Sequence, residues 1–585
     1  MHPKYLAFAM MSLLACRPAP TTGPAPVAAP GMSVAGIDSL LDTLPLRDRV
    51  AQLVMPWISG TYASLDDPEL ARTLSWVDSL HVGGLLVSVG SPLDIAAKLN
   101  YLQQRSPLPL LVGSDLESGT SFRLVGGTPF PPNMGVAAGG GEQAAYDIGT
   151  ITANEARAVG IHITFSPDAD VNSNPDNPII NLRSFGEDPG AVSGLVAAAV
   201  RGIQDHGLLA TAKHFPGHGD TDTDTHLDLP ATGANWSRLD SVELRPFRAA
   251  IRSGVAAIMS AHIALPAIDG GLHRPGTLSP VVQTAILRDS LEFRGLVLTD
   301  ALNMGSLIRN YTPATVAVEA LRAGADILLQ PGDPAAAIDA VVAAVRDGRI
   351  SRERLDRSVR RVLEVKRDLG LFARRGVPLD SITAEVGREQ YLTRAAQIAA
   401  LGMVLAEDRD GTVDSLRARP QPVALVSYGD DRSPDAGLRL AADLRARGYA
   451  VSGFRLSSAS GDASYDSARV VLGRAPVAVF AVAIRPAPWH PNGVALPQAL
   501  SRLIDSTAAA RRTVLVSEGS PYMIRATPAV SSYLLAWAAD PVSEAAAARA
   551  LAGTAPITGR LPISIPPRYP LGTGLRRGAD LGARP

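Results

Sequence analysis

The sequence has one cysteine, almost no net charge, and no apolar run of the roughly 20 residues that cross a bilayer. One cysteine excludes an intramolecular disulfide and a thiolate metal cluster, because both need at least two thiols. The 55 basic and 56 acidic side chains nearly cancel, so the charge gives no reason to expect nucleic acid as a partner. The 585 residues are 46% hydrophobic and 19% charged, which is typical of a folded globular protein.

The single cysteine lies near the start of the chain. It follows a short apolar run, residues 5–15, and this arrangement resembles a bacterial lipoprotein signal. We therefore expect residues 1–15 to be a removed signal peptide and Cys16 to carry the lipid. Residues 16–36 are rich in proline and alanine and are expected to form a tether. These features predict an exported cell-envelope protein that meets the membrane only through its lipid anchor; a plain secretory signal stays open as the alternative.

The remaining chain is too long for one ordinary domain, and its first part alternates short apolar runs with helical stretches. The runs are residues 53–55, 84–88, 110–114, 161–165, 209–212, 257–260, 296–299 and 327–329. Strands that alternate with helices favour a parallel sheet covered on both sides. Eight such units predict a (β/α)8 barrel of the TIM type over residues 37–385, in which active-site residues lie at the C-terminal ends of the strands.

A second, smaller α/β region follows. Residues 386–585 contain apolar runs at 423–426, 477–484, 513–516 and 533–536, with helical stretches such as 436–447 between them. Because the units are fewer than eight, we expect an open α/β/α sandwich. A glycine-rich run at 139–141 follows no strand, so a nucleotide-binding turn is not expected, and we predict no cofactor.

The densest polar stretch, residues 213–226, follows the fifth predicted strand, and its prolines and glycines favour a loop over the barrel mouth. Its aspartates resemble a calcium loop, but Thr225 and Ala231 stand where an EF-hand needs glycine and glutamate, so that class is rejected. A zinc site made by the three histidines of the stretch, at 214, 218 and 226, is a second hypothesis. The third is acid/base catalysis, with Asp224 orienting His226 two residues later.

At this point a family resemblance becomes specific. Residues 213–226, together with the run Asn-Leu-Arg-Ser-Phe-Gly-Glu-Asp-Pro at 181–189, resemble glycoside hydrolase family 3 and its β-N-acetylhexosaminidase branch, in the bacterial two-domain lipoprotein form. The ending at residues 559–566 is similar to the family's second-domain terminus. The resemblance implies that His226 is the acid/base, held by Asp224, and that no metal is required.

The resemblance also implies the nucleophile and the substrate contacts. It places a nucleophilic aspartate at the end of the seventh strand, where this chain has Asp300, and a carboxylate at a strand's C-terminal end also faces the pocket of a barrel. The implied substrate contacts are Asp115, Arg123, Arg183, Lys213 and His214. One arginine usual in the family is missing, since Asp115 is followed by Leu-Glu-Ser-Gly-Thr. This departure concerns the pocket edge and the aglycone.

The expected activity is that of an exo-acting, retaining β-N-acetylglucosaminidase that removes terminal β-linked N-acetylglucosamine. We expect the substrate to be peptidoglycan fragments, because an enzyme tethered in the cell envelope would meet them first. The partner is thus a carbohydrate. Three alternatives stay open: a β-glucosidase or β-xylosidase of the same family, with Glu518 as the residue to test; an N-acetylglucosaminide phosphorylase; and a non-catalytic cell-wall binding lipoprotein.

Overall fold

The computed structural model describes residues 32–485 and 496–579. Cys16, the expected signal peptide and most of the expected tether lie outside these residues. Helix α1 (Val34–Thr43) begins inside the stretch expected to be tether, because the Ser33 hydroxyl accepts a hydrogen bond from the Gly36 amide at 3.0 Å and caps the helix. In the described part of the chain, every helix is too short or too polar to pass through a membrane.

The first domain is built on parallel strands. Pairing runs in the order β2-β3-β4-β5-β6-β7-β8; β1 pairs with β9, and a bridge from Leu298 to Ile327 joins β8 to the segment just before β9. The strands are β1 (Val54–Met55), β2 (Trp57–Ile58), β3 (Gly84–Val87), β4 (Leu111–Ser114), β5 (Ile163–Thr164), β6 (Leu209–Phe215), β7 (Ala257–Ser260), β8 (Leu296–Thr299) and β9 (Leu328–Leu329). Each of the eight predicted apolar runs contains a strand.

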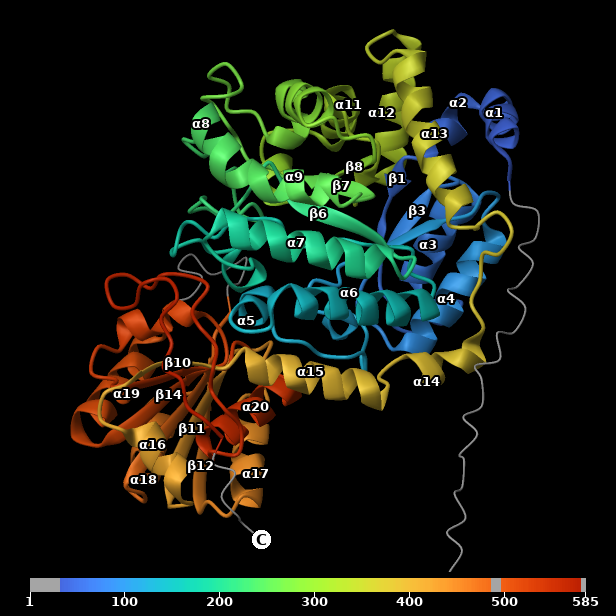
Figure 1. Ribbon diagram of the computed structural model, residues 1–585. Helices are drawn as coiled ribbons and strands as arrows, with labels where there is room; N and C mark the ends of the chain where they lie inside the picture. The colour runs from blue at the N-terminus through green and yellow to red at the C-terminus, as the bar shows by residue number, and fades with distance from the viewer. Residues whose placement is uncertain (1–31, 486–495, 580–585) are drawn as a thin grey trace, which may run out of the picture.

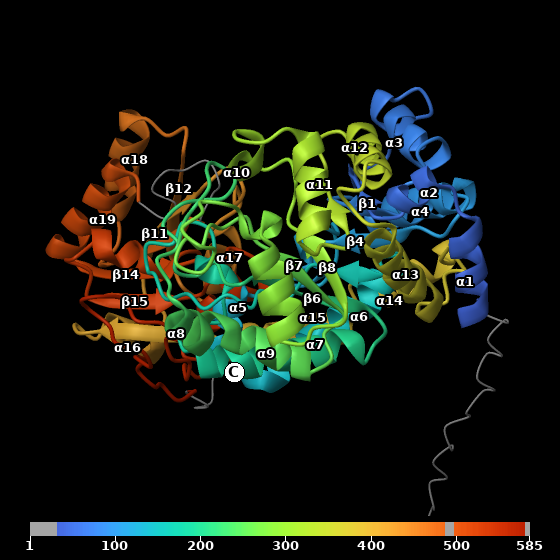
Figure 2. The same cartoon turned by 90° about the horizontal axis from the view of Figure 1, so that it is seen from above.

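Helices cover the outside of this sheet (Figure 1, Figure 2). Their bounds are α2 (Leu46–Ala51), α3 (Pro68–Asp78), α4 (Pro92–Arg105), α5 (Asn133–Ala137), α6 (Gly141–Ala158), α7 (Pro189–Gln204), α8 (Trp236–Arg238), α9 (Leu244–Arg252), α10 (Gly305–Ile308), α11 (Pro313–Ala323), α12 (Pro334–Arg346), α13 (Arg352–Asp368), α14 (Ile382–Glu385) and α15 (Glu389–Leu401). Several begin at a proline that follows a capping side chain, as Asp188 does for α7, because proline has no N–H to leave unsatisfied in the first turn.

The second domain is a six-stranded sheet with the order β10-β15-β14-β13-β11-β12, and only the β10–β15 pair is antiparallel. Its strands are β10 (Val404–Asp408), β11 (Val423–Gly429), β12 (Val451–Ser457), β13 (Val477–Ala483), β14 (Arg512–Ser517) and β15 (Ser532–Leu535). Its helices are α16 (Thr412–Ala418), α17 (Leu438–Ala446), α18 (Asp462–Leu472), α19 (Gln498–Ala510) and α20 (Pro541–Leu551). An α/β domain with a parallel sheet, followed by a second α/β domain, is therefore confirmed.

Three strands, β2, β10 and β12, were not predicted from the sequence; β2 has only two residues. β12 lies at the edge of the sheet and is largely exposed, so its sequence is polar and contains no continuous apolar run. β10 ends in Glu407 and Asp408, which are half-buried, and only its first three residues are fully buried. Hydrophobic runs reveal strands that are buried on both faces, and neither β10 nor β12 is one.

The two domains are joined by hydrogen bonds behind the strand ends. Both carboxylate oxygens of Glu187, in the first domain, accept from Ser564 in the second: the amide donates at 2.8 Å and the hydroxyl at 2.6 Å. The Asn172 side-chain amide also donates to the Tyr522 hydroxyl at 2.9 Å. These contacts fix the second domain against the edge of the first sheet where the strands end.

Glu187→Ala should weaken this interface, because it leaves the Ser564 amide and hydroxyl without acceptors. We expect a loss of about 1 to 3 kcal/mol, or a Tm lowered by roughly 2 to 4 °C, measured by calorimetry. Glu142→Ala is the control, since the Glu142 side chain is 64% exposed and its cation, Arg201, lies 4.0 Å away. Equal losses from both variants would contradict the role of Glu187.

Candidate active site

The sequence-predicted residues meet at the C-terminal ends of the first sheet's strands, around a cavity of about 830 Å³. All but one of the predicted catalytic and substrate-contacting residues line it: Asp115, Arg123, Arg183, Lys213, His214, His226 and Asp300. The exception, Asp224, lies buried behind His226. Lys213 and His214 belong to β6 itself, which extends to Phe215 rather than ending at residue 212 as expected.

The floor of the cavity is a buried ionic cluster around Glu117. Lys213 Nζ lies 2.6 Å from Glu117 Oε1, and Arg183 donates to both carboxylate oxygens, at 2.9 and 2.8 Å. Burial alone would raise the pKa of Glu117, but the charges of Arg183 and Lys213 outweigh it and hold that pKa well below its usual range. Glu117 is therefore ionised and keeps both cations in place.

Asp115 and Arg123 lie at the rim of this cluster. Asp115 directly follows β4 and accepts from Lys213 Nζ at 2.9 Å, and Arg123 Nη2 reaches its other oxygen at 3.4 Å. The Arg123 guanidinium also stacks over the Phe122 ring, 4.4 Å from its centre. Both side chains are about a quarter exposed, with 27% of each accessible, so they can reach a ligand in the cavity.

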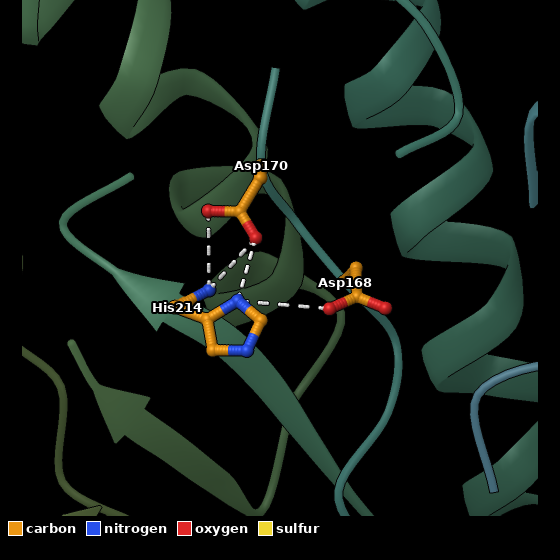
Figure 3. A group of neighbouring side chains, drawn as sticks. All are labelled: Asp168, Asp170 and His214. Carbon is orange, nitrogen blue, oxygen red and sulfur yellow. Dashed lines mark hydrogen bonds and ion pairs between the residues drawn. The ribbon is translucent and has the colours of Figure 1, made fainter. Parts of the chain in front are cut away.

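His214 is held by two buried aspartates, as Figure 3 shows. Its Nδ1 lies 2.7 Å from Asp170 and 3.6 Å from Asp168, and its Nε2 lies 3.1 Å from Arg183 Nη2. Because Asp170 accepts and Arg183 can only donate, Nδ1 of His214 donates to Asp170 and Nε2 accepts from Arg183. Burial and the charge of Glu117 raise the pKa of Asp168 to about 7.

Asp168, Asp170 and His214 lie close enough together to be considered as metal ligands. The cluster fits hydrogen bonding better, since both ring nitrogens of His214 already have partners and the Arg183 guanidinium lies 3.4 Å from Asp168. His218 and His226 are not part of this group, and the ring nitrogens of His218 face threonine hydroxyls at 2.6 and 3.3 Å. The zinc hypothesis for the three histidines gains no support from this arrangement.

The predicted pair of Asp224 and His226 is formed. Asp224 Oδ1 accepts from the His226 backbone amide and lies 2.8 Å from its Nδ1. The carboxylate is buried, with 3% of the side chain accessible, whereas 45% of the His226 side chain is accessible. Asp224 thus fixes Nδ1 as the protonated nitrogen and leaves Nε2 free toward the cavity.

The loop that carries His226 is attached to the segment after Asp300. The Ser306 amide donates to the Thr225 carbonyl at 3.1 Å, at the start of α10. Gly305 packs directly against the His226 carbonyl, so closely that a Cβ at this position would overlap the carbonyl oxygen. A glycine is therefore required where the loop approaches the segment after β8.

Asp300 directly follows β8 and is half-buried in the cavity wall. Its Oδ1 accepts from the Ala301 amide at 2.7 Å. Burial opposes its ionisation, but the interactions with His262 and His214, the Ala301 amide and Lys213 outweigh it and lower the pKa of Asp300 to about 2. Asp300 is thus an ionised carboxylate across the physiological range, as a nucleophile requires.

The second domain completes the cavity wall, which the sequence analysis did not foresee. Arg432, Arg485 and Trp537 line the cavity opposite the first domain's strand ends. Glu518, named above as a rival acid/base, does not line it: the side chain is fully buried and neither oxygen has a hydrogen-bond partner among the described residues. Burial raises the pKa of Glu518 well above its usual range, so it is neutral.

Glu117, Asp168 and Asp170 were also not assigned roles from the sequence. Glu117 lies within the motif that begins at Asp115. Its negative charge could have indicated a role in the site, because two buried cations, Lys213 and Arg183, need more than one carboxylate to balance them. Asp168 and Asp170 lie four and six residues after the end of β5, in the segment that leaves the C-terminal end of that strand. The rule that placed Asp300 could therefore have identified them.

Comparison with known families gives a clear result. Residues 45–365 match the family model described as "Glycosyl hydrolase family 3 N terminal domain". The chain belongs to glycoside hydrolase family 3. The match covers most of the first domain, including the cavity floor, His226 and Asp300.

Named relatives agree with this assignment. The chain is 33% identical over 382 residues to a protein of Cellulomonas fimi named beta-N-acetylglucosaminidase/beta-glucosidase, covering 64% of this chain and 67% of that protein. It is 31% identical over 391 residues to beta-hexosaminidase A of Pseudoalteromonas piscicida, covering 61% of this chain and 64% of that protein. The solved structure of a family 3 beta-N-acetylglucosaminidase from Paenibacillus sp. str. FPU-7 is similar at a TM-score of 0.79 and 33% identity, over 89% of this chain and 99% of that one.

Gly305→Ala should displace the His226 loop and slow turnover. A shift of about 1 Å in a catalytic group can cost roughly a hundredfold, so we expect kcat to fall between about 10-fold and 100-fold with little change in KM or in Tm. The control is Gly233→Ala, because Gly233 lies in the same loop with no atom within 4 Å of an added Cβ. Unchanged kcat in Gly305→Ala would show that the contact does not position His226.

Proposed function

We propose that the protein is an exo-acting, retaining β-N-acetylglucosaminidase that removes terminal β-linked N-acetylglucosamine. The observation that carries this proposal is that Asp300 and His226 line one cavity, with Asp224 fixing Nδ1 of His226. We also propose that the first sheet closes as a (β/α)8 barrel of the TIM type and that the second domain is an α/β/α sandwich. The bridge from Leu298 to Ile327 and the β1–β9 pair support this closure.

The proposed mechanism has two displacements. Asp300 attacks the anomeric carbon while protonated His226 donates its Nε2 proton to the leaving oxygen, so a glycosyl-enzyme forms and the aglycone departs. Neutral His226 then takes a proton from water, which attacks the anomeric carbon and releases Asp300 and the sugar. Asp224 stabilises the imidazolium in the first step and keeps Nε2 aimed at the oxygen.

The buried cluster supplies the sugar contacts in this proposal. Lys213, Arg183 and Arg123 offer N–H donors, Asp115 offers acceptors, and His214 lines the same wall, toward the hydroxyl and acetamido groups of a single non-reducing residue. Because these groups hold one another at fixed distances, they need little rearrangement when substrate binds. The wall made by the second domain then faces the aglycone.

Peptidoglycan fragments are the proposed natural substrate, and the cell envelope is the proposed location. The support is the lipoprotein-like sequence before Cys16, since a tethered envelope enzyme would meet such fragments first. Its partners would then be a glycan substrate and a membrane reached only through the lipid. The proposal includes no cofactor and no nucleic acid.

The substrate is tested by a paired assay on aryl β-N-acetylglucosaminide and aryl β-glucoside, each with and without phosphate. The proposal expects cleavage of the N-acetylglucosaminide with free sugar as product. Preference for the glucoside would identify a β-glucosidase instead. Formation of sugar 1-phosphate would identify a phosphorylase, and no activity on either substrate would favour a non-catalytic binding protein.

His226→Ala should discriminate between leaving groups. A 2,4-dinitrophenyl leaving group needs no proton, so kcat/KM on its glycoside should fall less than about tenfold, whereas kcat/KM on N,N′-diacetylchitobiose should fall about 10² to 10⁴-fold. His273→Ala, which removes an exposed histidine outside the cavity, is the control. Equal losses on both substrates would refute the acid/base role.

A further inference from the structure

A second cavity, of about 1240 Å³, lies at the opposite ends of the first sheet's strands. Its walls include His162 just before β5, the start of β6, Ala256 just before β7, and the last turns of α13. No residue lines both this cavity and the active-site cavity. In both ribbon views α13 lies on the side of the first domain that faces away from the second domain (Figure 1, Figure 2).

This cavity is strongly basic, although the chain as a whole carries a net charge of -1. Two carboxylates, Glu364 and Asp368, line it together with six guanidinium groups, which leaves an excess of four positive charges. The six are Arg157, Arg294, Arg361, Arg367, Arg374 and Arg375. Like charges gathered in one concave wall create a strong local potential for anions.

Most of these guanidinium groups have no carboxylate partner among the described residues. Three of them donate to backbone carbonyls instead: Arg157 to His206 at 3.1 Å, Arg294 to Arg288 at 2.8 Å, and Arg375 to Ser106 at 2.7 Å. A carbonyl orients a guanidinium but does not neutralise it. Arg374 is exposed, its backbone amide donates to the Gly370 carbonyl at 3.0 Å, and its side chain makes no hydrogen bond or ion pair within the part of the chain that the structure describes.

Arg367 gives a second, independent sign of a missing anion. Its Nε and Nη2 face Asp368 at 2.8 and 2.7 Å, but its Nη1 is buried and has no hydrogen-bond acceptor among the described residues. Buried N–H groups in folded proteins are nearly always paired, so an unpaired one on a residue that lines the cavity marks this guanidinium as incompletely satisfied by the protein. Asp368 is already engaged by Arg367, and Arg361 is paired with Asp326 at 3.0 Å, which leaves Glu364 to offset the other four arginines.

We propose that this cavity binds an anion that carries several phosphate groups. The planar guanidinium fork matches the spacing of phosphate oxygens, and several arginines in one wall favour a ligand with more than one such group. This site lies outside the glycosidase chemistry, and its test does not depend on the proposed substrate.

The test is isothermal titration of the full-length protein with sodium tripolyphosphate at low salt. We expect one site whose affinity falls about tenfold or more in Arg157→Gln/Arg374→Gln, because two exposed donors of the wall are lost, and which weakens as salt screens the charges. Hydrolysis of an aryl glycoside should stay within about twofold of wild type, since neither arginine lines the active-site cavity.

The matched control is Arg419→Gln/Arg502→Gln, which removes two exposed arginines of the second domain. A parallel arm measures sedimentation with phosphatidylglycerol vesicles against phosphatidylcholine vesicles. Loss of tripolyphosphate binding in Arg157→Gln/Arg374→Gln, but not in the control, supports a free phosphate ligand. Loss of vesicle binding in Arg157→Gln/Arg374→Gln, but not in the control, supports lipid headgroups as the source. No binding of either probe, or equal losses in both pairs, would overturn the proposal.

Discussion

Two buried cations, Lys213 and Arg183, converge on the single carboxylate of Glu117, and the rest of the active site depends on this arrangement. Removing Glu117 would leave Lys213 with Asp115 alone and Arg183 with Asp168 at 3.4 Å, so both cations would lose their nearest carboxylate inside the protein, which costs more than losing an exposed pair. The cluster therefore fixes the segment after β4, the strand β6 and the loop after β5 relative to one another. His214 is oriented by the same cluster through Arg183 and Asp170.

The two proposed catalytic residues, Asp300 and His226, are held differently by the structure. Asp300 directly follows a buried strand, and its carboxylate is fixed by the Ala301 amide. His226 is on a long loop, and its link to the segment after β8 consists of one backbone hydrogen bond and the contact with Gly305. The proposed nucleophile is thus preorganised by the fold itself, whereas the position of the proposed acid/base depends on how closely one loop can approach its neighbour.

Hydrophobic runs were enough to predict eight of the nine strands of the first domain, because nearly all residues of these eight strands are buried; the two-residue strand β2 was missed. The position of polar residues at strand ends, together with the family motifs, predicted residues that the structure places around one cavity. The sequence analysis missed what depends on distant contacts: the role of Glu117, the support of His214 by Asp168 and Asp170, and the wall from Trp537 and Arg485. The edge strand β12 was missed because an exposed strand has no apolar run. The basic cavity could not be predicted either, because its arginines come from segments far apart in the sequence and the net charge of the whole chain is close to zero.

The central claim, that Asp300 forms a covalent glycosyl-enzyme, is tested most directly by trapping with a 5-fluoro N-acetylglucosaminyl fluoride and mapping the labelled peptide by mass spectrometry. The account predicts one sugar on the peptide that contains Asp300. Because the pKa of Asp300 is lowered to about 2, the carboxylate stays ionised as the pH falls, and the labelling rate should be constant between about pH 4 and pH 6. A label on another carboxylate, no label during turnover, or a rate that falls with an apparent pKa above about 4 would contradict it.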